Sequence, residues 1–400
     1  MLKMSQNGSS PNIKLHVLIV GAGIAGLSAA RALRLCGHSV EIFERSKFSN
    51  EVGAAVTISP NGTRVLQALG FNFTKVGGVD IRFLRTGNAR TMDITADIDT
   101  GCAEEIYGAP HQAMHRQDLH SELLRLATLE PDSDSADLGQ LKGLHMGVKI
   151  TKIDIQNSIL ELDDGRYFQG DVVIGADGLH SDIRAAALGR RQEPIDTEWQ
   201  IYRFLLPREK VMDDEIISGL KVGNSRLMFN CPDRNGVVNS RQANDILYWR
   251  VYEREPLPNF VHHHTILVGD AGHAMTPFTA AGATQALEDA GALLGLFKDL
   301  KDGEGEVGRR LGLTGSTTPF KDGRRNPLAD ENLRIELLDE DLPSELRGLG
   351  PQNPKRLAFD FKYDVFRKCR EVLAEEVEFQ ELWFWVFTWM RNRYDYEVFG

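Results

Sequence analysis

The sequence predicts an α/β fold built around a parallel β-sheet, and three neighbouring segments support this. Residues 15–20 (LHVLIV) form a short apolar run that is typical of a buried parallel strand. A glycine-rich turn follows at 21–26 (GAGIAG) and opens an alanine- and leucine-rich segment with helical spacing, which Gly37 is placed to end. Residues 39–43 (SVEIF) have the pattern of a second strand. The order and lengths match one strand–helix–strand unit of a Rossmann-like domain.

The three glycines of the turn predict a site for a pyrophosphate. Gly21 permits a tight turn from strand to helix, and Gly23 lets backbone N–H groups approach the phosphates. Gly26 lets the helix pack closely on the strand, and the helix amino terminus adds partial positive charge. Glu44 ends the second strand, where a carboxylate can accept hydrogen bonds from both ribose hydroxyls and repels a 2′-phosphate. FAD and NAD both fit this pattern, whereas NADP is disfavoured in this pocket.

Length and charge narrow the classes of function. A chain of 400 residues is too long for one ordinary core, so two interleaved domains are expected. The formal net charge of −11 disfavours nucleic acid and anionic membrane surfaces as partners, because both repel an acidic protein. The longest apolar stretch, 382–390, is too short to cross a bilayer, so we expect no transmembrane segment. The oligomeric state stays open.

Cysteine usage and the first residues predict a cytoplasmic location. The four cysteines lie far apart with no CxxC pair, as in proteins whose thiols stay reduced. Residues 1–12 are polar and lack the apolar core of a secretory signal, and we expect them to be disordered. Three successive histidines at 262–264 lack the spacing of metal ligands, so we expect a solvated turn there and no metal site.

Three further blocks separate the cofactor alternatives. They are HRQDL at 115–119, GADGLHS at 175–181 and GDAGHAMTP at 269–277, and the last two follow apolar strand-like runs. Together with the glycine turn, this set resembles the single-component flavin monooxygenases of the salicylate hydroxylase-like family, especially the branch common in fungal secondary metabolism. The resemblance covers about residues 13–300. It implies an FAD-binding domain with the fold of that family and an interleaved antiparallel substrate-binding sheet.

The resemblance also implies roles for residues around the cofactor. Arg116 would reach the FAD, and Gly53 and Ala54 would line the flavin pocket. Asp177 belongs to a block that serves FAD and the transient visit of NAD(P)H in the family, although a carboxylate there can also simply cap a turn.

The isoalloxazine end of the cofactor is implied to meet a turn and a helix. Asp270 would accept hydrogen bonds from the ribityl chain, at the carboxyl end of a strand where such sheets bind ligands. Gly282 and Ala283 would begin a helix whose amino terminus stabilises negative charge at N1 and C2=O of reduced flavin. Arg203, within YRFLLP at 202–207, resembles a catalytic or substrate-orienting arginine of the family, and the alternative is a surface arginine beside a strand.

The implied reaction uses NAD(P)H and O2. In the family, reduced flavin forms a C4a-hydroperoxide that transfers one oxygen atom, so the expected activity is hydroxylation or epoxidation of an aromatic, polyketide or terpenoid compound. Two alternatives remain: an FAD-dependent dehydrogenase or reductase without oxygen insertion, and a catalytically silent flavin-binding pathway protein. The substrate and the choice between NADH and NADPH stay open.

The chain divides into discontinuous domains, and some segments depart from the family. We expect an FAD-binding domain, a shortened substrate domain, an irregular insert and a carboxy-terminal helical segment. The FAD-binding domain comprises 13–80, 110–190 and 262–300, and the substrate domain comprises 81–109 and 191–261. The insert is 301–355 and the helical segment is 356–400. Residues 131–143 have the composition of a surface loop. The departures from the family are a short connection at 240–252, Phe229 in place of a tyrosine, and AAGAT at 280–284 in place of GQGAN.

Overall fold

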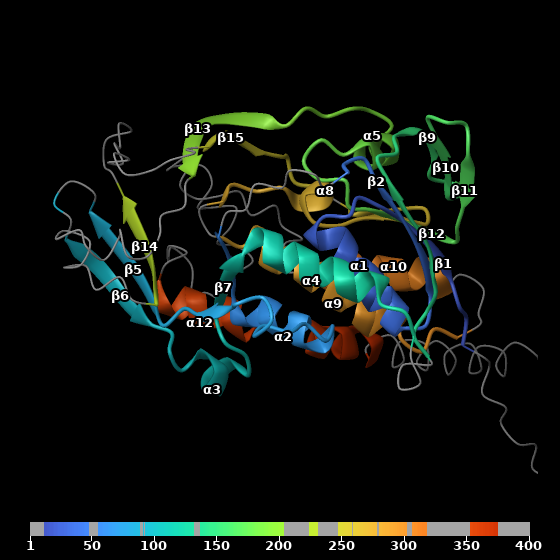
Figure 1. Cartoon of the computed structure of the whole chain (residues 1–400). Coiled ribbons are helices and arrows are strands. Elements are labelled where there is room, and N and C mark those ends of the chain that lie inside the picture. Colours follow the sequence, from blue (N-terminus) through green and yellow to red (C-terminus); the bar gives the residue numbers. More distant parts are fainter. Residues whose placement is uncertain are drawn as a thin grey trace, which may run out of the picture.

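The fold is described here from a computed structural model. It describes residues 12–47, 55–88, 91, 93–131, 137–203, 224–230, 247–257, 259–277, 280–301, 306–317 and 353–374. These residues form the predicted α/β fold, with one six-stranded sheet, four smaller sheets and packed helices (Figure 1). None of the helices in this part of the chain is long and apolar enough to cross a membrane.

The central sheet has the strand order β16-β17-β12-β1-β2-β8, and every pair except β16–β17 is parallel. Its middle strands carry apolar runs because helices cover one face and a small sheet covers the other. The edge strand β8 starts at Leu141, within the segment that composition assigned to a loop. The strands are β1 (His16–Val20), β2 (Ser39–Glu44), β8 (Leu141–Met146), β12 (Val172–Gly175), β16 (Val261–His262) and β17 (Thr265–Leu267).

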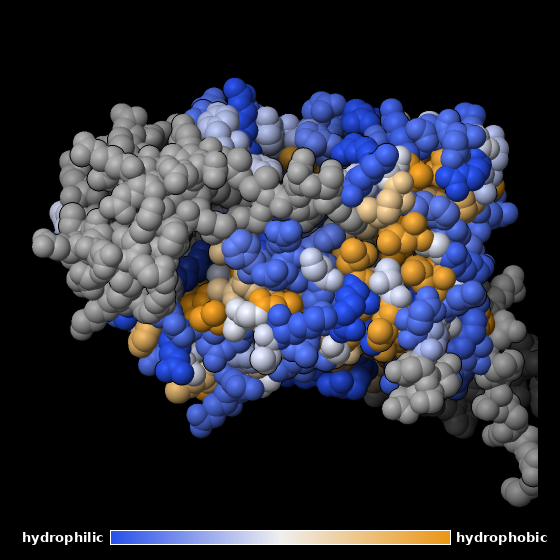
Figure 2. All heavy atoms as spheres, viewed as in Figure 1, coloured by the Kyte–Doolittle hydropathy of each residue, from blue (hydrophilic) through white to orange (hydrophobic). Residues whose placement is uncertain are grey.

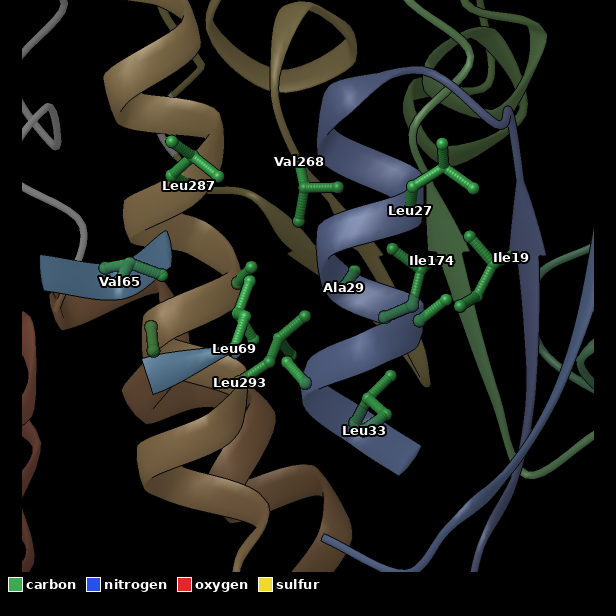
Figure 3. Packing of buried hydrophobic residues seen from close by; sticks show 14 of the residues in the cluster. Ile19, Leu27, Ala29, Leu33, Val65, Leu69, Ile174, Val268, Leu287 and Leu293 are labelled. Atoms are coloured by element: carbon green, nitrogen blue, oxygen red, sulfur yellow. The ribbon is translucent and has the colours of Figure 1, made fainter. Parts of the chain in front are cut away.

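Helices pack in layers on one face of this sheet. Figure 3 shows Ile19 and Ile174 of the strands facing Leu27 of α1, with α9 packed on the opposite side of α1. Gly37, with φ +80°, follows the end of α1 in the left-handed conformation predicted for it. The helices are α1 (Ile24–Leu35), α2 (Pro60–Ala68), α4 (Arg116–Thr128), α9 (Gly282–Phe297) and α10 (Glu306–Thr317).

The other face of the sheet packs against a small antiparallel sheet. Leu18 and Phe43 of the central sheet join Leu160 of β10 in a second apolar cluster. Apolar residues reach the surface beside α4, between this helix and the neighbouring strands (Figure 2). The elements on the face of the sheet opposite α1 are β9 (Ile150–Asp154), β10 (Ile159–Leu162), β11 (Tyr167–Gln169), α5 (Asp182–Leu188) and α8 (Asp270–His273).

The segments predicted for the substrate domain form small sheets at the other end of the molecule (Figure 1). One sheet has the order β14-β5-β6, and a second pairs β13 with β15. A third sheet, β3-β7-β4, consists of segments predicted for the FAD-binding domain and adjoins α4 and α9. The elements are β3 (Ala55–Ile58), β4 (Val79–Asp80), β5 (Phe83–Asn88), β6 (Ile94–Asp99), β7 (Gln112–His115), β13 (Ile195–Arg203), β14 (Ser225–Asn230), β15 (Leu247–Glu253) and α3 (Ala103–Tyr107).

The carboxy-terminal region is helical over its described part and docks on α2. Helix α12 (Pro354–Lys362) is followed by helical residues 365–374, and Arg64 of α2 donates hydrogen bonds to the carbonyls of Phe361 and Tyr363. The prediction of an irregular insert at 301–355 is wrong at residues 306–317, which form α10. Glycines lower the helical propensity of this segment, but burial of Leu311 against the core stabilises the helix.

A buried arginine joins α1 to the end of α4. Arg34 is fully buried, and its guanidinium donates to the carbonyls of Gly139 (2.7 Å), Ala127 (2.5 Å) and Leu129 (2.7 Å). Burial lowers the pKa of Arg34 from its ordinary value. These three carbonyls have no place in a helix or sheet ladder, so the guanidinium satisfies acceptors that would otherwise be buried without partners.

We predict that Arg34→Leu lowers the free energy of unfolding by about 3 kcal/mol, because it leaves several buried acceptors unpaired. Urea unfolding measures this change. Arg166→Leu is the matched control, since Arg166 pairs with Asp164 at the surface and should contribute little to stability. Equal losses in the two variants would contradict the assignment.

Candidate cofactor site

The glycine turn brings α1 into direct backbone contact with the sheet. A Cβ on Gly26 would lie 1.9 Å from the Gly21 carbonyl oxygen, and a Cβ on Gly21 would lie 2.2 Å from the Ala176 carbonyl oxygen. Gly21 also has φ +101°, which L side chains rarely adopt. In contrast, a Cβ on Gly23 would meet nothing within 4 Å. Packing therefore leaves no room for a side chain at Gly21 or Gly26, while Gly23 borders open space at the start of α1.

Glu44 lies beside this turn at the carboxyl end of β2. Its Oε2 accepts a hydrogen bond from the Ala22 N–H (2.7 Å), and its Oε1 accepts one from the Ser46 N–H (2.6 Å). An ionised carboxylate offers about four acceptor positions, so capacity remains for ribose hydroxyls. His120 of α4 holds the same turn from the other side through Nε2 and the Ala22 carbonyl oxygen (2.8 Å).

Asp270 begins α8 just after β17 and faces solvent. Desolvation by the surrounding protein raises its pKa, while the positive charges of His273 and Arg116 act in the opposite direction. The exposed carboxylate therefore lies in a recess of the protein and not on an outer surface. Arg116, the first residue of α4, and Asp270 are brought close enough for this electrostatic interaction, as a shared cofactor site requires.

Helix α9 starts at Gly282, and its amino terminus is open for an anionic group. Ala281 provides no side-chain cap, the first turn holds no acidic residue, and a Cβ on Gly282 would meet nothing within 4 Å. Ala283 is the next residue of this turn. The first N–H groups of the helix thus keep their capacity to bind an acceptor.

Asp289 and Glu288 are buried acids of α9 that sequence reasoning did not single out. Asp289 Oδ2 accepts a hydrogen bond from the Gly269 N–H (2.8 Å) and lies 2.7 Å from His273 Nε2. Burial lowers the pKa of His273, but the charges of Asp289 and Asp270 outweigh it, so the pKa is raised overall. Two adjacent acids in an otherwise apolar helix were the available sequence signal, because buried carboxylates need partners.

Glu288 turns away from this pair and contacts α2. Its Oε1 accepts a hydrogen bond from Asn61 Nδ2 (2.7 Å), and the side chain is 1% exposed. Burial raises its pKa to about 8, with a further contribution from the negative charge of Asp289. The carboxyl group of Glu288 is therefore protonated at neutral pH, while its neighbour Asp289 faces the positive charge of His273.

Asp177 follows β12 and caps α5. Its Oδ1 accepts a hydrogen bond from Ser181 Oγ (2.5 Å), and its Oδ2 accepts from the N–H groups of Asp182 (2.7 Å) and Ile183 (3.1 Å). The turn-capping alternative therefore describes the contacts of this side chain. A contact of Asp177 with a cofactor stays a prediction.

The remaining predicted residues are placed only in part. Gly53 and Ala54 lie outside the described residues. Arg203 is the last residue of β13 and pairs with Leu247 of β15, but its side chain is outside the described part of the structure. Of the histidine run, His263 occupies the turn between β16 and β17 with φ +53°.

The carboxyl ends of four neighbouring parallel strands thus define a nucleotide-binding α/β protein. The glycine turn follows β1, Glu44 ends β2, Asp177 follows β12 and the Asp270 turn follows β17. Ligands bind at this edge in open sheets of this class. The space at Gly23, the spare acceptor capacity of Glu44 and the uncapped amino terminus of α9 fit a pyrophosphate, a ribose and a flavin, respectively.

Comparisons with known proteins identify the family. A family model described as "FAD binding domain" matches residues 14–253. An FAD-dependent monooxygenase of Aspergillus candidus, cfoG, is 29% identical over 71% of this chain and 77% of its own length, and further fungal relatives carry the same description. The 3-amino-4-hydroxybenzoate 2-monooxygenase of Streptomyces cremeus is 29% identical over 70% of this chain and 78% of its length.

A solved structure shows the same fold. The structure of CtdE in complex with FAD and a substrate superposes with a TM-score of 0.66 at 18% identity, covering 92% of this chain and 100% of that one. The chain belongs to the FAD-dependent monooxygenases of the salicylate hydroxylase-like family, within the branch found in fungal secondary metabolism. The predicted family, fold and FAD cofactor are confirmed.

We predict that Gly23→Ala and Gly26→Ala fail in different ways. Gly23→Ala should fold with a loss of about 1 kcal/mol or less, yet retain FAD at least about tenfold more weakly, because its methyl group enters the space of the pyrophosphate. Gly26→Ala should lower stability by about 3 kcal/mol or prevent folding, because its Cβ meets backbone. Flavin content and urea unfolding measure both effects. Normal FAD affinity in Gly23→Ala would contradict the role of this space.

We predict that Glu288 makes stability depend on pH. Between about pH 4.5 and 8 the folded protein holds a proton on Glu288 that the unfolded chain has lost, so stability falls as pH rises through this window. Glu288→Gln keeps the acceptor for Asn61 and removes the titration. The stability gained by the variant should be about 4 kcal/mol larger at pH 8.5 than at pH 5. Glu104→Gln, at an exposed position of α3, is the control and should leave the profile unchanged.

Proposed function

We propose that this protein is an NAD(P)H-dependent monooxygenase that hydroxylates or epoxidises a small aromatic, polyketide or terpenoid compound in the cytoplasm. The observation that carries the proposal is the convergence of four elements at one edge of the sheet: the glycine turn, Glu44, the Asp270 turn and the amino terminus of α9. A relative named for an aminohydroxybenzoate substrate supports the aromatic class.

The chain's own residues bind and orient the cofactor in this proposal. FAD, when bound, supplies electron transfer from the reduced nicotinamide and activation of O2. Glu44 accepts hydrogen bonds from the ribose hydroxyls, and Asp270 accepts them from the ribityl chain. The N–H groups at Gly282 and Ala283 hold the negative charge that develops at the pyrimidine edge of the flavin. Arg116 balances the charge of Asp270.

Substrate orientation falls to the small sheets that adjoin this edge. Arg203 lies at the end of β13, in a two-stranded sheet with β15. A guanidinium at this position would bind and orient an anionic or phenolic oxygen of the substrate. This assignment rests on the sequence motif and on the position of Arg203 in its strand.

We predict that the purified protein with NADPH, 18O2 and a panel of phenolic acids and related aromatics yields a product carrying one labelled oxygen, identified by mass spectrometry. Arg203→Ala should lower kcat/KM for that substrate at least about tenfold, since an orienting contact is lost. Arg250→Ala, on the neighbouring strand and paired with Asp196 at the surface, is the control. NADPH oxidation without labelled product across the panel would contradict oxygen insertion and favour a dehydrogenase or reductase.

A further inference from the structure

One carboxylate oxygen of α9 holds both sides of the Asp270 turn. Asp289 Oδ2 accepts the hydrogen bond of the Gly269 N–H at 2.8 Å and lies 2.7 Å from His273 Nε2. Gly269 and His273 flank Asp270 in the chain. Both side chains of the ion pair are nearly inaccessible to solvent, 9% exposed for His273 and 6% for Asp289. The contacts therefore form a buried clasp between α9 and the turn.

The clasp supports an unusual backbone conformation in the turn, which Arg184 of α5 also holds by donating to the carbonyls of Ala271 (3.3 Å) and Gly272 (2.9 Å). Gly269 has φ +56° and ψ −144°, a region open almost only to glycine. A Cβ at this position would lie 2.7 Å from the Cβ of Ala25 in α1, so the turn is also pressed against that helix. Because Asp289 belongs to the helix whose first turn begins at Gly282, it joins the two elements that flank the flavin position.

The charges around His273 favour its protonated form. Asp289 contacts it from α9, Asp270 acts on it from its own helix, and the ring of Phe260 packs against its ring at 6.0 Å between centroids. Burial lowers the pKa of His273, yet the two carboxylates outweigh burial and raise it. Glu288, the acid next to Asp289, holds its own proton up to about pH 8 and adds no charge below that pH.

We propose that His273 and Asp289 are positioning residues of the FAD site: the ion pair holds the 269–273 turn so that the Asp270 carboxylate is presented to the cofactor. Neither side chain needs to touch FAD. The positive charge of His273 opposes the desolvation that raises the pKa of Asp270, which a neutral imidazole would do less well. The proposal rests on FAD binding and is independent of oxygen insertion.

The sign of the pH dependence follows from the histidine. Because its pKa is raised, His273 is positively charged at pH 6. It loses this charge as pH rises through its pKa. The clasp weakens as His273 loses its proton, and Asp270 then loses the positive charge of His273 that compensates its own. FAD should therefore dissociate more readily at high pH. Glu288 has a pKa of about 8, between the two pH values compared below, so the measurement is made in a Glu288→Gln background, which removes this second group.

The experiment follows the fluorescence of FAD released when the holoenzyme is diluted, at pH 6 and pH 9. In the Glu288→Gln reference protein the dissociation constant should rise by about tenfold between these pH values, because the charge that holds the turn is lost. Adding His273→Gln should weaken binding by about tenfold at pH 6 and remove the pH dependence. Adding Asp289→Asn keeps an acceptor for the Gly269 N–H but no charge, and it should also give weak, pH-independent binding.

His38→Gln in the same background separates positioning from a general loss of stability. His38 is buried at the amino ends of β1 and β2, at the opposite edge of the central sheet, where its Nδ1 accepts a hydrogen bond from the Leu15 N–H at 3.2 Å. This variant should unfold at lower urea concentration but keep the dissociation constant and its pH profile. The proposal is overturned if His273→Gln and Asp289→Asn retain the reference profile, or if His38→Gln loses FAD to the same extent.

Discussion

The backbone contact between α1 and the ends of β1 and β12 is the constraint on which the cofactor site depends. Gly26 stands against the carbonyl of Gly21, and Gly21 against the carbonyl of Ala176, so no side chain separates the helix from the sheet. This approach points the first N–H groups of α1 along the edge of the sheet and leaves the space beside Gly23 open. Glu44 then reaches back to the Ala22 N–H, which places an acid next to that space. The same contact lets Gly269 approach Ala25 and brings the Asp270 turn alongside α1.

A second constraint comes from the adjacent acids of α9, which meet different surroundings. Glu288 faces an amide of α2, and burial raises its pKa to about 8 although Arg64 acts in the opposite direction. Asp289 instead contacts His273 and accepts a hydrogen bond from the Gly269 N–H. If both were charged, they would repel each other within a dry helix interface. The division lets one helix carry a stabilising polar contact to α2 and an ion pair toward the cofactor site.

The sequence predicted those parts of the structure whose signals are local. The β1–α1–β2 unit was predicted because apolar runs, glycines and Glu44 lie within a few residues of one another. The strand β8 was missed because an edge strand needs less burial, so its composition resembles a loop. Arg34 and Asp289 act through partners that are distant in the chain, and no local pattern shows which helix they will meet. The proposed role of Arg203 has the weakest sequence signal, since it rests on a short motif in a strand whose partner is set by the tertiary fold.

The departure of residues 280–284 from the family pattern can be judged in physical terms. The usual first glycine is replaced by Ala280, which still adopts φ +53°, at a strain of about 1 kcal/mol for an L side chain. The usual asparagine is replaced by Thr284, whose Oγ1 lies 3.1 Å from Ser59 Oγ and accepts a hydrogen bond from the Ser59 N–H at 3.3 Å. The turn therefore keeps a left-handed residue and a side-chain anchor to the segment before α2, and α9 still begins at Gly282. Because the amino terminus of α9 is open and Thr284 contacts the segment before α2, the altered motif is compatible with a cofactor site.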